Sequence, residues 1–69
     1  MNKMEALGKL VRDTRKQQKL TQEELSATTG VGVRFLRELE KGKESCQTGK
    51  VLLVLAMLGL TIQIDGKPL

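Results

Sequence analysis

Apolar residues recur every three or four positions through most of the chain, which is the period of one face of an α-helix. This pattern predicts helices at about residues 4–18, 22–28, 33–40 and 48–58. The last of these contains VLLVLAML, which is apolar almost all round and therefore indicates a helix buried on more than one side. Residues 60–65, LTIQID, alternate between apolar and polar, which is typical of a β-strand. The pattern thus predicts an all-α domain with four helices and one short C-terminal strand.

The second and third helices are joined by a short turn whose residues favour a sharp reversal. Thr21 and Glu24 have the spacing of a capping box at the start of the second helix. Gly30 follows the end of that helix, where the backbone needs a positive φ. Gly32 opens the next helix but has no side chain with which to cap it. Two helices joined in this way form a helix-turn-helix, the unit that places its second helix in the major groove of DNA.

Composition narrows the class of protein. The chain has 69 residues, so we expect a single domain over residues 1–69. Its net charge of +4 favours an anionic partner, nucleic acid before a membrane. With one Cys, no His and no phosphate-binding glycine loop, the sequence gives no support for an enzyme, a metal site or a cofactor. The cysteine usage fits a cytoplasmic protein, and the apolar run at 51–60 is shorter than the roughly 20 residues that span a bilayer.

The C-terminal part of the chain favours a dimer. A chain this short is marginally stable alone, and a single strand leaves backbone groups unpaired. We therefore predict that residues 60–65 pair with the same strand of a second subunit across a two-fold axis, and that residues 66–69 end the pairing. The predicted dimer interface consists of Leu55, Leu58, Leu60, Thr61, Ile62, Gln63 and Ile64.

The pattern LxxxVRxxRxxxxLTQEELxxxxGVxxxxLxxLExGK over residues 7–43 resembles the Xre/Cro family of bacterial and phage repressors. The resemblance implies a four-helix, lambda-repressor-like DNA-binding domain. Residues 52–60, LLVLAMLGL, run straight into the strand, which is similar to the HipB-type antitoxins. Membership of that branch implies a homodimer joined by a small β-lid, repression of its own operon, and a HipA-like kinase toxin as partner.

The resemblance also assigns roles to single residues. Gln22 would grip a phosphate at the start of the second helix, and Glu23 would lie at the groove edge or be an ordinary solvated acid. Arg15 and Glu40 match a structural ion pair. The positions that match base-facing residues of the family are Gly32, Val33, Arg34, Arg37 and Glu38, of which Arg37 would take either a phosphate or a base.

The chemistry of the charged side chains indicates which contacts with DNA they can make. Arg34 can bond guanine O6 and N7 together, which is worth about 1–3 kcal/mol of discrimination. Glu38 could accept from a cytosine, but four residues after Arg34 it is more simply that residue's ion-pair partner. Lys41, Lys43 and Lys50 are candidate phosphate contacts, which position a protein without reading sequence.

For several other residues we expect a role in packing and not in binding DNA. Gly8 is expected where helices approach closely, and residues 1–3 are expected to fray. Ser26 and Thr29 stand where the family usually has alanine, so we expect a slight adjustment there. Phe35 is read as packing over the second helix, or as a partner-binding anchor, and Cys46 as filling a small apolar site.

The leading hypothesis is a cytoplasmic, nucleoid-associated repressor that is also the antitoxin of a HipA-like kinase toxin and regulates its own operon. The alternative is a stand-alone Xre-family or phage-type repressor without a toxin. A third hypothesis is a protein-interaction module that no longer touches DNA. A two-fold dimer would bind double-stranded operator DNA with an inverted repeat, its half-sites about 34–36 Å apart.

Overall fold

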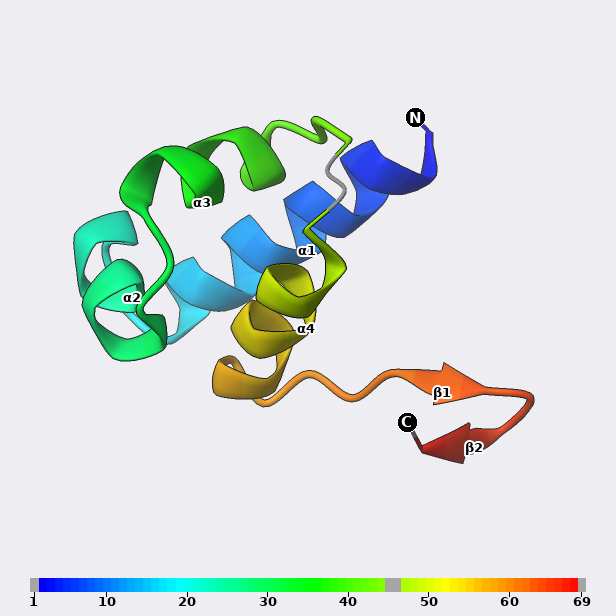
Figure 1. The fold of residues 1–69 in the computed structure, drawn as a ribbon. Coiled ribbons are helices and arrows are strands. Elements are labelled where there is room, and N and C mark those ends of the chain that lie inside the picture. The colour runs from blue at the N-terminus through cyan, green and yellow to red at the C-terminus, as the bar shows by residue number, and fades with distance from the viewer. Residues whose placement is uncertain (1, 45–46, 69) are drawn as a thin grey trace.

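The computed structural model describes residues 2–44 and 47–68. Four helices, α1 (Lys3–Gln17), α2 (Gln22–Thr29), α3 (Val33–Glu40) and α4 (Thr48–Met57), are followed by two short strands, β1 (Gln63–Ile64) and β2 (Lys67–Pro68). The helices pack around one core. After α4 an extended segment runs back to the other side, where the strands form a hairpin that projects from the helices (Figure 1). The predicted all-α class is therefore confirmed, with each helix within a residue of its predicted bounds. Among the described residues, no helix has the length and apolarity needed to cross a membrane.

Local hydrogen bonds fix where the first two helices begin. The Thr21–Glu24 capping box forms as predicted: the Glu24 N–H donates to Thr21 Oγ1 at 3.0 Å, and the Thr21 N–H donates to Glu24 Oε1 at 2.9 Å. A second box, which the sequence analysis missed, joins Asn2 to Glu5 with distances of 2.8 and 3.0 Å. The expectation that residues 1–3 fray was therefore wrong for Asn2 and Lys3, because Asn2 is a good cap and α1 begins directly after it.

The core is aliphatic, and all four helices or the turns beside them contribute to it. Its eight buried apolar residues are Val11, Leu25, Val31, Leu36, Leu39, Val54, Leu55 and Leu58. Partly buried residues, including Phe35, Leu60 and Ile62, pack around this cluster.

Leu55 and Leu58 were predicted at a dimer interface, and that assignment needs correction. They are 4% and 3% exposed within the single chain, so they have almost no area left to give to a partner. Together with Val54 they form the inward face of α4. The large apolar residues that α4 exposes are Leu53 and Met57, at 42% and 44%.

The predicted strand at residues 60–65 was also too long, and it has a partner within its own chain. β1 covers only Gln63–Ile64 and pairs antiparallel with β2, with Gln63 opposite Pro68 and Ile64 opposite Lys67. Asp65 and Gly66 form the turn with φ of 51° and 80°. An Asp-Gly pair with positive φ at both residues is the preferred two-residue hairpin connection. Lys67 and Pro68, which were expected to end the pairing, therefore take part in it.

Gly8 lies where α1 meets the end of α3, as predicted. A Cβ on Gly8 would collide with the carbonyl oxygen of Leu39 and lie 2.8 Å from that of Glu40. Only a residue without a side chain permits this approach. The contact fixes α1 against the C-terminal half of α3. Cys46, for which an apolar site was expected, lies outside the described residues.

Candidate nucleic-acid interface

The turn between α2 and α3 has the geometry expected of a helix-turn-helix. Gly30 takes the left-handed conformation with φ of 79°, and its N–H donates to the Ser26 carbonyl at 2.8 Å. Gly32 is the N-cap of α3 and makes no side-chain cap bond, as predicted. The direction of α3 must therefore be set by contacts other than its own cap.

Two hydroxyl groups supply such contacts at Val31. The Ser26 hydroxyl donates to the Val31 carbonyl, and the Val31 N–H donates to Thr29 Oγ1 at 3.3 Å. Thr29 is itself buried and donates to the Leu25 carbonyl at 2.8 Å. Only a slight adjustment was expected at Ser26 and Thr29, and their hydrogen bonds to the Val31 backbone were not predicted. The signal was available, because Ser and Thr readily hydrogen-bond nearby backbone.

A buried ion pair holds the other end of α3. Arg15 Nε donates to Glu40 Oε2 at 2.7 Å and Arg15 Nη2 donates to Oε1 at 2.9 Å, with side chains 9% and 4% exposed. Hydrogen bonding to Glu40 raises the pKa of Arg15. Arg15 Nη1 also donates to the Leu20 carbonyl at 2.8 Å, and Gln22 Nε2 donates to Glu40 Oε1 at 3.1 Å. The expected partners are thus brought together, and they join α1, the start of α2 and the end of α3.

The solvent-facing side of α3 carries a second charged group. Arg34, with a side chain 87% exposed, places Nε 3.4 Å from Glu38 Oε1. Lys43 places Nζ 3.3 Å from the other oxygen of the same carboxylate. The hydrogen bond from Lys43, with a smaller contribution from Arg34, lowers the pKa of Glu38. Of the two alternatives left open for Glu38, the structure shows the ion pair with Arg34 and adds Lys43 as a second partner.

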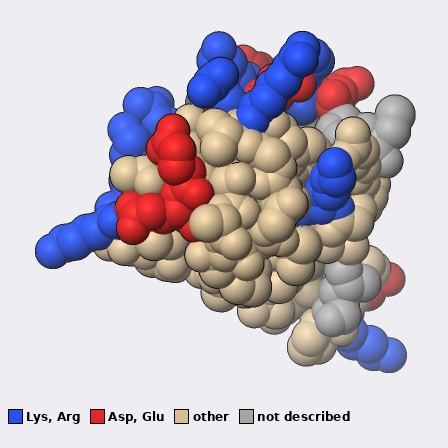
Figure 2. Space-filling view, turned by 60° about the vertical axis from the view of Figure 1, so that its left-hand side comes forward, with Lys and Arg blue, Asp and Glu red and all other residues tan. Residues whose placement is uncertain are grey.

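The remaining predicted contact residues differ in exposure. Lys50 is exposed on α4, with Nζ 5.7 Å from the centroid of the half-buried Phe35 ring. Figure 2 brings the α2–α3 side forward and shows basic side chains along its margin with acidic ones among them. Glu23, Gly32, Arg37 and Lys41 are exposed, whereas Gln22 and Val33 are half-buried.

Comparison with known proteins agrees with this geometry. A family model described as helix-turn-helix matches residues 11–63, which include α2, the turn and α3. The chain belongs to the Xre-type helix-turn-helix family. It is also 53% identical over 58 residues to the uncharacterized HTH-type transcriptional regulator y4mF of Sinorhizobium fredii (strain NBRC 101917 / NGR234). That alignment covers 84% of this chain and 76% of the relative.

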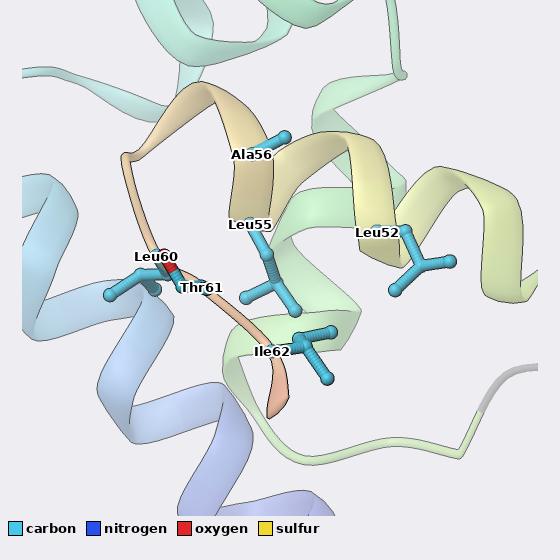
Figure 3. A pocket seen from close by; sticks show the side chains of 6 residues that line it. All are labelled: Leu52, Leu55, Ala56, Leu60, Thr61 and Ile62. Atoms are coloured by element: carbon cyan, nitrogen blue, oxygen red, sulfur yellow. The ribbon is translucent and has the colours of Figure 1, made fainter. Parts of the chain in front are cut away.

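Away from the helix-turn-helix, this Xre-type domain has an apolar hollow beside α4. The pocket shown in Figure 3 has a volume of about 280 Å³ and is lined by Leu52, Leu55, Ala56, Leu60, Thr61 and Ile62. A neighbouring pocket of about 310 Å³ extends from Ile62 toward Met4 and Leu7 of α1. Leu60, Thr61 and Ile62, predicted at a dimer interface, thus border this hollow, while Gln63 and Ile64 are exposed in β1.

Proposed function

We propose that this protein is a repressor that binds specific sequences in double-stranded DNA through α3. The observation that carries the proposal is the presentation of α3: its polar face is exposed, while its two ends are held by the Val31 hydroxyl contacts and the Arg15–Glu40 pair. Membership of the helix-turn-helix family supports it, as does the name of the relative, a transcriptional regulator. Such a protein would act on the nucleoid in the cytoplasm.

In this proposal the N-terminal half of α3 enters the major groove. Arg34 reads a guanine, Val33 meets a thymine methyl group, and Gly32 lets the backbone come close. Glu38 orients the Arg34 guanidinium through their ion pair. Gln22 and Glu23 lie at the groove edge at the start of α2, and Lys41, Lys43 and Lys50 contact phosphates.

We propose further that the repressor acts as a homodimer. The partner is a second copy of the chain, seated on the apolar side of α4 and the hairpin. Leu53, Met57 and Ile64 are 42%, 44% and 58% exposed, so each leaves apolar area available to a partner. Within the described residues, β1 pairs only with β2, so its other edge is open to a partner strand. Its operator would then be an inverted repeat with half-sites about 34–36 Å apart.

The antitoxin role is the next step of the proposal. It is supported by the resemblance of residues 52–60 to the HipB-type antitoxins and by the two-stranded ribbon that follows them. If it holds, the protein purified from its native host should carry a kinase-like protein. Co-purification of DNA alone would favour the stand-alone repressor instead.

The proposed function is tested by selecting duplexes from a random-sequence pool with the purified protein. The enriched duplexes are then footprinted. Arg34→Ala should relax specificity at one base pair, because it removes a base contact. Lys43→Ala should weaken all duplexes alike and lower the salt dependence of binding, because it removes a phosphate contact. Failure to enrich any duplex would favour the interaction-module hypothesis. Identical behaviour of the two variants would show that base and phosphate contacts are wrongly assigned.

A further inference from the structure

A basic groove lies where α1, the start of α2 and the end of α3 meet. It has a volume of about 300 Å³ and is lined by Arg12, Gln22, Arg37, Glu40 and Lys41. Three of these five side chains are cationic, and they come from two helices and the residue that caps the second of them. Arg12 is not among the residues to which the sequence analysis gave a role in binding DNA.

Among the described residues, the three cations of this groove are in no ion pair, in contrast to Lys9, Arg15, Arg34 and Lys43. Lys9 is paired with Asp13, Arg15 with Glu40, and Arg34 and Lys43 both with Glu38. Within residues 2–44 and 47–68, Arg12, Arg37 and Lys41 form no ion pair. The one acid in the groove, Glu40, already accepts hydrogen bonds from Arg15 and Gln22. The groove therefore has a net positive charge available to an anion.

The fold explains how Arg12 reaches this place. Arg12 lies one helical turn after Gly8, on the side of α1 that approaches the Leu39 and Glu40 carbonyls. That approach carries Arg12 alongside the end of α3. Arg37 is one turn beyond Arg34 on α3, so the groove adjoins the surface proposed to read bases.

We infer that this groove seats a backbone phosphate of the duplex, and that Arg12 of α1 is a phosphate contact acting with Arg37 and Lys41. The inference rests on the proposed function and adds a contact from outside the helix-turn-helix. A phosphate seated here would be held by groups on α1 and α3 at once, which would fix the angle of the whole domain on the DNA. The contact would carry no sequence information.

The test compares Arg12→Gln with Lys3→Gln. Both substitutions remove one positive charge from an exposed position of α1. Because the two residues are nine positions apart, they lie on opposite faces of that helix, and Lys3 does not line the groove. Binding is measured as a function of salt, on one duplex selected by the wild type and on one random-sequence duplex.

Arg12→Gln should lower the slope of log affinity against log salt by about one unit on both duplexes, and Lys3→Gln should leave it nearly unchanged. Arg37→Gln combined with Arg12→Gln should lower it by about two units. Arg12→Lys should keep the wild-type slope, which separates charge from packing. Urea unfolding of each variant checks that the domain is intact.

Equal slopes for Arg12→Gln and Lys3→Gln, with wild-type binding intact, would overturn the assignment of Arg12 and leave the proposed function standing. A loss of affinity by Arg12→Gln on the selected duplex alone would overturn it too, because that would indicate base reading. A wild-type chain that binds neither duplex would overturn the proposed function and this inference together.

Discussion

At the scale of single residues, Gly8 shows how one missing side chain can position a helix. In an ordinary helix Gly→Ala stabilises by about 0.5–1 kcal/mol. Here the added Cβ meets the backbone of Leu39 and Glu40, which cannot move aside like the tip of a side chain. We therefore predict that Gly8→Ala destabilises the domain by about 1–3 kcal/mol.

Gly49 offers the matched control for this prediction. It lies inside α4, and a Cβ added there would meet nothing within 4 Å. Gly49→Ala should therefore stabilise the domain by about 0.5–1 kcal/mol. Urea unfolding of the two variants measures both effects. Equal stabilisation by both would mean that α1 and α3 are not in backbone contact at Gly8.

The Arg15–Glu40 pair makes a second prediction at this scale. Glu40→Ala leaves the buried Arg15 guanidinium without its carboxylate, which should cost about 3–5 kcal/mol in the free energy of unfolding. Asp13→Ala breaks the exposed Lys9–Asp13 pair, with side chains 63% and 48% exposed, and should cost less than about 1 kcal/mol. Chemical denaturation compares the two. Similar costs would contradict the buried character of the first pair.

These residues also show which contacts can be predicted from the sequence and which cannot. Arg15 and Glu40 are 25 positions apart, and only the family resemblance suggested that they meet. The hydroxyls of Ser26 and Thr29 were visible in the sequence, but their acceptor and donor on Val31 depend on the path of the turn. The charged groups lining the groove with Arg12 come together only once α1 crosses the end of α3.

At the scale of elements, the helices were predictable because their causes are local. Apolar spacing, the Thr21–Glu24 box and Gly30 all act within a few residues. The hairpin had a local signal too, in Asp65-Gly66, but the alternation through residues 60–65 suggested one longer strand. That alternation has another cause: Leu60 and Ile62 pack against the helical core before the strand begins.

The capping box of α2 gives a prediction about pH. The hydrogen bonds from Thr21 lower the pKa of the Glu24 carboxyl below its value in the unfolded chain, about 4.3. The stability that this carboxylate contributes is therefore present above that pH and is lost as the pH falls through the lowered pKa. Glu24→Gln retains a capping acceptor but does not titrate.

We expect Glu24→Gln to lose less stability than the wild type between pH 7 and pH 3, although it begins from a lower value at pH 7. Urea unfolding at several pH values measures the two curves. The other carboxylates with a lowered pKa, those of Asp13 and Glu38, are present in both proteins and act as an internal control. Parallel curves would show that Glu24 does not contribute through its charge.

At the scale of the whole molecule, the largely apolar sequence of α4 favoured a dimer because it indicated burial on more than one side. The structure buries one side of α4 within the single chain and leaves the other exposed. The apolar helix α4 divides into an inward face, with Val54, Leu55 and Leu58, and an exposed side with Leu53 and Met57. Periodicity could not make this division, because every position from Val51 to Met57 is apolar. It becomes apparent only when the other helices are in place.

The dimer prediction is tested at Ile64, the most exposed of the large apolar residues that the structure describes. Ile64→Asp should convert a dimer to a monomer in sedimentation experiments, because it places a charge at the proposed contact between copies. Leu10→Asp, at a residue 49% exposed on α1, should leave the dimer intact. A wild-type chain that sediments as a monomer, or two variants with the same effect, would contradict the proposed interface.

The Glu38 carboxylate, shared by Arg34 and Lys43, has a consequence for how a genome would be searched. Only Nε of the Arg34 guanidinium contacts Glu38, so its two Nη groups remain available to a base edge. A base edge that matches the orientation held by Glu38 can bind these groups without breaking the ion pair. On the proposed function, a base edge in any other position would gain less from Arg34, so the protein would leave random DNA sooner than its operator.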